Sequence, residues 1–185
     1  MYRDPSKLLK FLPPRSVSLL LATGVVCRWV WAARIPLGND EAYYWDWGRH
    51  LMLSYFDHPP GVAWVARAGS LLFGGDSLGA RGLVPLMHVV ATLALASCVS
   101  TMKGELLTRG DWYRLLLVVQ VVPIFGLGGF LLMPDAGLLM FLSVLAAVGV
   151  KRLEGRVNFW HGIYYGCTSP RLGIGATSPR LPQDH

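Results

Sequence analysis

Carboxylates gather with aromatic side chains and a histidine between residues 39 and 60 of a chain that is otherwise hydrophobic. Residues 39–47 read Asn-Asp-Glu-Ala-Tyr-Tyr-Trp-Asp-Trp, and residues 54–60 read Ser-Tyr-Phe-Asp-His-Pro-Pro. A carboxylate can act as a general base or bind a cation, and a histidine can move a proton or contact a phosphate. Hydrophobic residues make up 53% of the 185 residues and charged residues only 15%, so this concentration of acids predicts a site for chemistry.

The first motif predicts a helix that begins at Asn39, with Asp40 and Glu41 in its first turn. Tyr43 and Tyr44 follow Asp40 at i+3 and i+4, and a tryptophan follows at i+7, so all three rings share a helical face with that carboxylate. This face suits a carbohydrate or a polar headgroup. The acids could also serve only to complement the helix dipole.

The second motif ends in Asp57-His58-Pro59-Pro60. The two prolines stiffen the backbone and keep the residue before them out of the helical region, so Asp57 and His58 lie on a rigid extended segment. An acid and a histidine in sequence could bind a divalent cation or contact a phosphate. Two ligands are too few for a metal site alone, and a plain turn before the next helix explains the pattern nearly as well.

Long apolar runs predict an all-α integral membrane protein, because about 20 apolar residues are enough to cross a bilayer as a helix. We expect about four transmembrane helices, at residues 16–35, 83–101, 115–132 and 136–150. Residues 62–73 are apolar but too few to cross, and we expect them to form a helix at the membrane interface. The loop between the first two spans therefore contains interfacial helices and both motifs.

Basic residues predict the orientation of these spans. They cluster before the first span, between the second and third, and after the fourth, as the positive-inside rule expects of cytoplasmic segments. The 36–82 loop and the turn at Pro134-Asp135 then lie together on the extracytoplasmic side. Asp135 is thereby expected at the same membrane level as Asp40, although a proline followed by an acid is also a common helix start.

Three polar residues, Arg28, His88 and Gln120, fall inside the expected spans. Such residues usually face a protein interior or a cavity rather than lipid. Arg28 is close enough to the end of its span for its side chain to extend to the surface, and His88 is expected to be a packed, hydrogen-bonded residue.

The composition also bears on other classes of function. The net charge of +6 comes from basic residues at the ends of apolar runs, so we expect no nucleic-acid partner. The three cysteines form no CxxC motif or disulfide framework. A small transporter-like or non-catalytic membrane protein remains an alternative, although a transporter should carry ionisable residues deep within several spans.

The ordered motifs resemble those of GT-C glycosyltransferases, in the family that includes protein O-mannosyltransferases and the aminoarabinose transferase of lipid A. The matching segments are Asp-Glu-Ala-Tyr-Tyr-Trp at 40–45, Phe-Asp-His-Pro-Pro at 56–60, Gly-Asp-Ser-Leu-Gly-Ala-Arg at 75–81 and Pro-Asp-Ala at 134–136. The resemblance implies transfer of a sugar from a polyprenyl-phosphate donor to a lipid, glycan or protein acceptor. It also implies a multi-pass protein of the bacterial inner membrane whose active face is extracytoplasmic.

The resemblance further implies roles for particular residues. Asp40 would be the catalytic base, and Asp135 would assist it on the acceptor or metal side. Asp57 and His58 stand where relatives bind a divalent metal or the donor phosphate. A substrate-binding role for Tyr43, Tyr44, Glu41 and His58 follows from the same comparison. Such donors carry no nucleotide, in keeping with the lack of a GxGxxG or P-loop motif in the sequence.

The expected organisation has three parts. Residues 1–15 form a cytoplasmic N-terminus, residues 16–155 the N-terminal part of a GT-C membrane domain, and residues 156–185 a disordered or aberrant tail. The tail contains Thr-Ser-Pro-Arg-Leu twice, at 168–172 and 177–181, and has no core-forming pattern. Relatives are usually longer, so we expect a truncated product that could be inactive.

Overall fold

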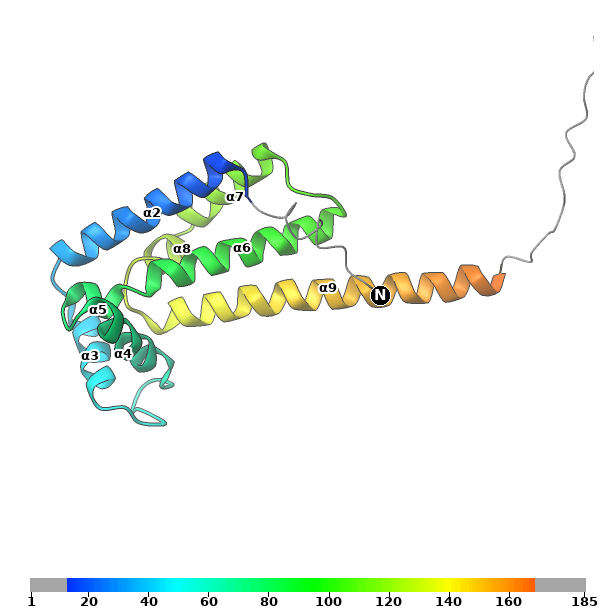
Figure 1. Cartoon of the computed structure of the whole chain (residues 1–185). Helices are drawn as coiled ribbons and strands as arrows, with labels where there is room; N and C mark the ends of the chain where they lie inside the picture. Colours follow the sequence, from blue (N-terminus) through cyan, green and yellow to red (C-terminus); the bar gives the residue numbers. More distant parts are fainter. Residues whose placement is uncertain (1–12, 169–185) are drawn as a thin grey trace, which may run out of the picture. The chain divides into compact units, whose positions relative to one another are not determined.

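The structure is a computed structural model that describes residues 13–168. For Ile124 and residues 155–168 it describes only the backbone. The predicted cytoplasmic residues 1–12 and the end of the predicted tail, from residue 169, lie outside the described part. Every regular element described is a helix (Figure 1): α2 (Arg15–Arg34), α3 (Asn39–Arg49), α4 (Gly61–Phe73), α5 (Ser77–Arg81), α6 (Val84–Lys103), α7 (Arg109–Val121), α8 (Pro123–Gly128) and α9 (Pro134–Thr168). This confirms the predicted all-α membrane class. The described residues from 13 to 151 pack as one compact unit, which the following paragraphs describe.

Three helical segments in the described part are long and apolar enough to cross a membrane: Arg15–Arg34, Ser77–Lys103 and Pro134–Glu154. They confirm three of the four predicted spans. The prediction of one continuous span over residues 115–132 is wrong, because α7 ends at Val121 and α8 begins at Pro123. Proline has no N–H to continue the helical ladder, and it holds the preceding Val122 in an extended conformation with ψ 115°.

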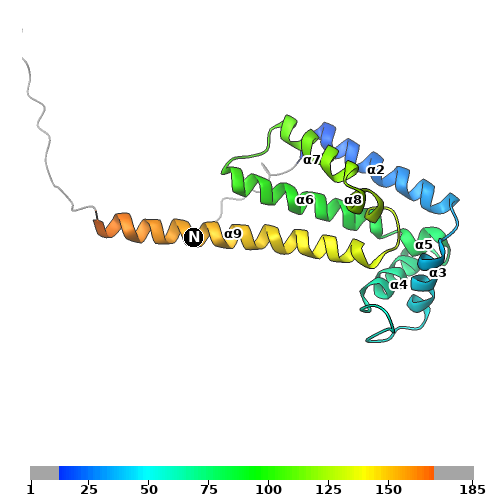
Figure 2. The same cartoon turned by 180° about the vertical axis from the view of Figure 1, so that it is seen from behind.

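The predicted interfacial helix is α4, which has 13 residues and spans about 20 Å, well short of the hydrocarbon core. Its buried face contacts α3 and α5, and its other face exposes Trp64, Leu71 and Leu72. Figures 1 and 2 both show α3, α4 and α5 gathered at one end of the long helices. The approach of α4 to α5 depends on Gly79, where a Cβ atom would lie 1.6 Å from the carbonyl oxygen of Gly74.

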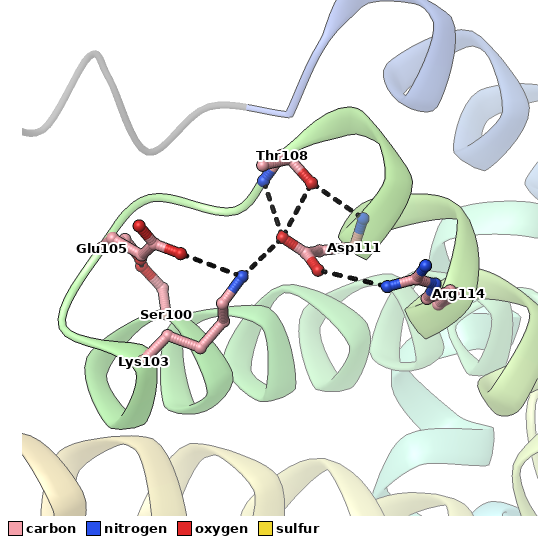
Figure 3. A network of polar contacts seen from close by, with 6 residues as sticks. All are labelled: Ser100, Lys103, Glu105, Thr108, Asp111 and Arg114. Atoms are coloured by element: carbon pink, nitrogen blue, oxygen red, sulfur yellow. Dashed lines mark hydrogen bonds and ion pairs between the residues drawn. The ribbon is translucent and has the colours of Figure 1, made fainter.

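The opposite end of the unit is a tight connection between α6 and α7 (Figure 3). Helix α6 ends at Gly104, whose φ of 70° is the left-handed conformation that glycine adopts without strain. Thr108 then caps α7 in a capping box with Asp111, and Lys103 Nζ lies 2.8 Å from that carboxylate. The Lys103 ammonium, together with the hydrogen bonds from Thr108, lowers the pKa of Asp111. The connection returns the chain so that Trp112 of α7 is buried in the same cluster as Val17 of α2.

Arg28 does not extend to the end of its span as predicted. Its Nη1 atom donates a hydrogen bond to the carbonyl oxygen of Gly24, one turn closer to the start of α2, at 3.3 Å. Side chains on a helix lean toward its N-terminus, and Gly24 leaves the space for this one. Arg28 therefore remains within the packed helices.

Candidate functional site

A buried ion pair between Glu41 of α3 and Arg81 of α5 organises the end of the unit that carries both motifs. Only 5% of Glu41 and 1% of Arg81 is exposed. Arg81 Nε donates to Glu41 Oε1 at 2.7 Å, and Arg81 Nη2 donates to Glu41 Oε2. The same guanidinium donates to the carbonyl oxygens of Ile35 and Pro36 at 2.8 and 3.1 Å. It thereby ties α3 and α5 to the segment that leaves α2.

Glu41 also accepts hydrogen bonds from two backbone N–H groups. Gly38 donates to Oε2 at 3.0 Å and Leu132 donates to Oε1 at 2.9 Å. A carboxylate offers about four lone-pair sites, and four protein donors occupy them. Burial alone would raise the pKa of Glu41, but the hydrogen bonds from Arg81, Gly38 and Leu132 bring it below its ordinary value. Since Leu132 lies just before Pro134-Asp135, this carboxylate joins the predicted first motif to the start of α9.

Three further carboxylates act on Tyr44 through their negative charge. Tyr44 is 9% exposed, and its burial together with the negative charges of Asp40, Asp57 and Asp135 raises its pKa. These acids come from α3, from the second motif and from the first turn of α9, and all three are exposed to solvent. The predicted extended segment at Asp57 and His58 is instead a bend, which includes Phe56. The structure thus confirms that Asp135 lies near the first loop, as the predicted topology requires. It brings together three acids that are far apart in the sequence.

Stacked aromatic rings build one wall of this site. The rings of Trp47 and Tyr55 are nearly parallel, with centroids 4.3 Å apart, and Tyr43 packs on Trp47 at 4.5 Å. The Tyr43 hydroxyl also lies 3.5 Å from Asp57 Oδ2. The Tyr55 hydroxyl lies 2.9 Å from the carbonyl oxygen of Trp47, in the last turn of α3, and 3.0 Å from that of His50, which follows the helix, so its single O–H can donate to either. The sequence did not predict a role for Tyr55. Its only distinguishing feature there is that it is an aromatic residue shortly before the Asp-His-Pro-Pro turn.

His58 faces both the carboxylates and an apolar cavity. Its ring lies 5.5 Å from that of Tyr44, nearly edge-on, and its Nδ1 atom is buried without a hydrogen-bond partner. His58 and Asp135 line one end of a cavity of about 700 Å³. The remaining lining comes largely from apolar side chains of α4, α6 and α9, including Trp64, Met87 and Phe141. Two residues of the polar site therefore line an apolar cavity formed by α4 and by two helices that can span a membrane.

A divalent metal at Asp57 and His58 stays a prediction. Among the side chains that the structure describes, no three of His, Cys, Asp or Glu lie close enough to hold a metal ion together. Metal sites in proteins normally draw on more than two protein ligands or on substrate oxygens. The described residues therefore do not make a metal site by themselves.

Comparison with known proteins gives two matches. Residues 57–169 match the family described as dolichyl-phosphate-mannose-protein mannosyltransferase. A segment of 66 residues is 41% identical to lipid A galacturonosyltransferase RgtD of Rhizobium johnstonii. That segment covers 35% of this chain but only 14% of the relative, so the chain spans much less than two thirds of the relative's length. No solved structure matches the chain.

Proposed function

Because this chain belongs to the dolichyl-phosphate-mannose-protein mannosyltransferase family, we propose that it transfers a sugar from a polyprenyl-phosphate donor to a lipid, glycan or protein acceptor. The chain is a membrane protein with three helices suited to spanning a bilayer in its described part. We further propose that it lies in the bacterial inner membrane with its active face extracytoplasmic. The family match and the distribution of basic residues support this placement.

One observation carries the proposal. The negative charges of Asp40, Asp57 and Asp135 all act on the phenol of Tyr44. One of these acids, Asp135, also lines an apolar cavity together with His58, whose ring packs against that of Tyr44. A lipid-linked sugar has the matching polarity, with an apolar chain on one side of a phosphate and a hydroxyl-rich ring on the other. The cavity wall of Trp64, Met87 and Phe141 suits the chain, and the carboxylates and aromatic rings suit the sugar and the acceptor.

Asp40 acts as the general base in the proposed reaction. It takes the proton of the acceptor hydroxyl as the acceptor oxygen bonds to the anomeric carbon of the sugar. The bond between that carbon and the phosphate oxygen breaks, and the phosphate keeps the electron pair and leaves as polyprenyl phosphate. Asp135 and Asp57 orient the acceptor and the sugar hydroxyls, and Tyr43 and Tyr44 line the pocket. The raised pKa of Tyr44 keeps its phenol protonated, so it can donate a hydrogen bond.

His58 contacts the donor phosphate in this scheme. Its buried Nδ1 atom has no protein partner, and an imidazole N–H there would donate to a phosphate oxygen. A divalent metal could share the phosphate with Asp57 and His58, where it would neutralise charge on the leaving group. No step of the scheme depends on it.

Glu41 acts through the residues that it positions. Its four hydrogen bonds are all to protein donors, so direct substrate binding by Glu41 has no support from its contacts. The pair with Arg81 fixes the first turn of α3, which contains Asp40, and Glu41 also accepts a hydrogen bond from Leu132 in the turn that leads to Asp135. We therefore propose that Glu41 and Arg81 are positioning residues.

Transfer assays in membranes test the proposal. Membranes that contain the chain should move label from a polyprenyl-phosphate sugar to endogenous acceptors, and membranes without it should not. Gly137 of α9 lines the apolar cavity, and a Cβ there would lie 3.5 Å from Met87 Cε. Gly137→Leu should therefore occupy the cavity and raise the KM for the donor.

Gly149→Leu is the matched control on the same helix, where nothing lies within 4 Å of an added Cβ. It should leave the donor KM unchanged. No transfer by the unsubstituted chain, or an equal effect of the two substitutions, would contradict the proposed donor site.

A further inference from the structure

A second cavity, of about 340 Å³, lies between α2, α6 and α7 and has a polar end and an apolar end. Arg28 of α2, His88 of α6 and Gln120 of α7 form the polar end, one residue from each helix. All three are among the polar residues that fall inside the expected spans. Their convergence on one cavity is separate from the Asp40 site, which lies on the extramembrane helices.

Arg28 brings a positive charge into this cavity without a neighbouring acid. Its Nη2 atom donates to Gln120 Oε1 at 2.7 Å and its Nη1 atom to a backbone carbonyl. No carboxylate of the described residues forms an ion pair with it. A charge within a membrane segment is costly, and it usually faces a partner of opposite sign or a polar ligand. The contacts of Arg28 satisfy hydrogen bonds but leave its charge without a counter-ion.

His88 supplies an unused polar atom at the same place. The residue is 7% exposed, and its Nε2 atom is buried with no hydrogen-bond partner among the described residues. The structure thus confirms that His88 is packed, as predicted. The predicted hydrogen bond is absent at its Nε2 atom within the described part of the chain. Its ring is held against Gly129, where a Cβ atom would lie 2.6 Å from Nδ1. Buried polar groups without partners are uncommon and call for an explanation, such as a bound ligand.

The apolar end of the cavity follows α2 back toward its start. Leu20, Leu21 and Leu117 line it, and Leu20 is eight residues before Arg28, which is about 12 Å along the helix. Arg28 and Gln120 lie in the second halves of α2 and α7, and His88 lies in the first half of α6, so the polar end is on the side toward α3 and α5. The Arg28 guanidinium itself reaches back to the level of Gly24. A cavity with this polarity matches a lipid that has a charged head and an apolar chain.

We propose that this cavity binds an anionic lipid, with its phosphate contacted by Arg28, His88 and Gln120 and a hydrocarbon chain along Leu20 and Leu117. The guanidinium provides the counter-charge, and the imidazole and amide provide hydrogen-bond donors. A bilayer phospholipid and a polyprenyl phosphate share this chemistry. The proposal does not depend on the proposed transfer reaction.

Lipid binding to the purified chain, measured by native mass spectrometry from detergent, tests the proposal. The probes are phosphatidylglycerol, a polyprenyl monophosphate and zwitterionic phosphatidylcholine. Arg28→Gln should weaken the binding of both anionic lipids by about tenfold, which is the loss expected when one hydrogen bond to a charged group is removed. Arg34→Gln removes the same charge from the exposed last turn of α2 and should change binding by no more than about twofold.

Leu117→Trp provides a second test that keeps every charge. Leu117 is 64% exposed, so the larger ring can be accommodated without disturbing the core, yet it would fill part of the cavity. Leu117→Trp should weaken the binding of both anionic lipids. It therefore tests the proposal even if Arg28→Gln fails to fold, a failure that circular dichroism and gel filtration would reveal. Competition between phosphatidylglycerol and polyprenyl phosphate identifies the preferred source. Equal binding of phosphatidylcholine, equal loss in Arg34→Gln, or unchanged binding in Leu117→Trp would each overturn the proposal.

Discussion

Replacing Glu41 by glutamine tests the structural basis of the site most severely, because one change removes the counter-ion of a buried arginine. Glu41 accepts four hydrogen bonds, two from Arg81 and one each from the backbone of Gly38 and Leu132. A glutamine offers one oxygen, and its amide N–H₂ would face protein donors. Arg81 would remain 1% exposed with its charge unpaired.

Breaking a buried ion pair in this way costs about 3–5 kcal/mol. For a chain of this size, 1 kcal/mol corresponds to about 2–4 °C in Tm, so Glu41→Gln should lower the Tm by about 6–20 °C. The assay is thermal unfolding of the detergent-solubilised chain, followed by intrinsic tryptophan fluorescence. Trp45 and Trp47 lie on the same helix as Glu41 and should report the change.

Asp46→Asn is the matched control on the same helix. Asp46 pairs with Arg49 at 3.8 Å, but both side chains are about 60% exposed, so this pair contributes at most about 1 kcal/mol. A double substitution to apolar residues, Glu41→Leu with Arg81→Met, should cost less than the sum of the two single changes, because no unpaired charge remains. If Glu41→Gln lowered the Tm no more than Asp46→Asn, the role assigned to the buried pair would be refuted.

Two further predictions concern packing and pH. Gly79→Ala should destabilise the chain by about 1–3 kcal/mol, because the added Cβ would overlap the carbonyl oxygen of Gly74. Gly61→Ala is the control, since a Cβ there meets nothing within 4 Å. It should be neutral or slightly stabilising in the same Tm measurement. The pKa of Glu41 is lower in the folded chain than its ordinary value of 4.5, so the unfolded chain binds the proton more readily. The stability that Glu41 contributes should therefore be fully present above about pH 5 and be lost as the pH falls through its folded pKa. Tm measured from pH 7 downward should fall as the pH decreases in the unsubstituted chain, and it should fall less in Glu41→Gln. The same dependence of Tm on pH in both proteins would be evidence against this role of Glu41.

The sequence predicted the helices and the grouping of acids because both depend on local patterns. Apolar length identified three spanning segments, and the shortness of residues 62–73 identified α4 as a helix that does not cross. The distribution of basic residues placed Asp135 on the side of the first loop, and its charge does act on Tyr44. Each of these predictions needed only composition, length and order along the chain.

The features that the sequence did not predict depend on long-range contacts or on one residue within an apolar run. Pro123 divides the expected 115–132 span, but its effect is lost among the apolar residues around it. The pairing of Glu41 with Arg81 joins residues 40 apart, and nothing local distinguishes it from an exposed acid at a helix start. The direction of Arg28 is likewise decided by Gly24 and by Gln120 of another helix.

Sugar transfer by the Asp40→Asn variant tests the proposed function most directly. The measurement is the initial rate of label transfer from a polyprenyl-phosphate sugar in membranes, compared with the unsubstituted chain and with Asp46→Asn. General base catalysis contributes about 10²–10⁴-fold, so Asp40→Asn should lower the rate by about that factor at an unchanged amount of folded protein. Asp46→Asn should transfer at nearly the full rate. Equal rates for Asp40→Asn and the unsubstituted chain would contradict the assignment of Asp40 as the base.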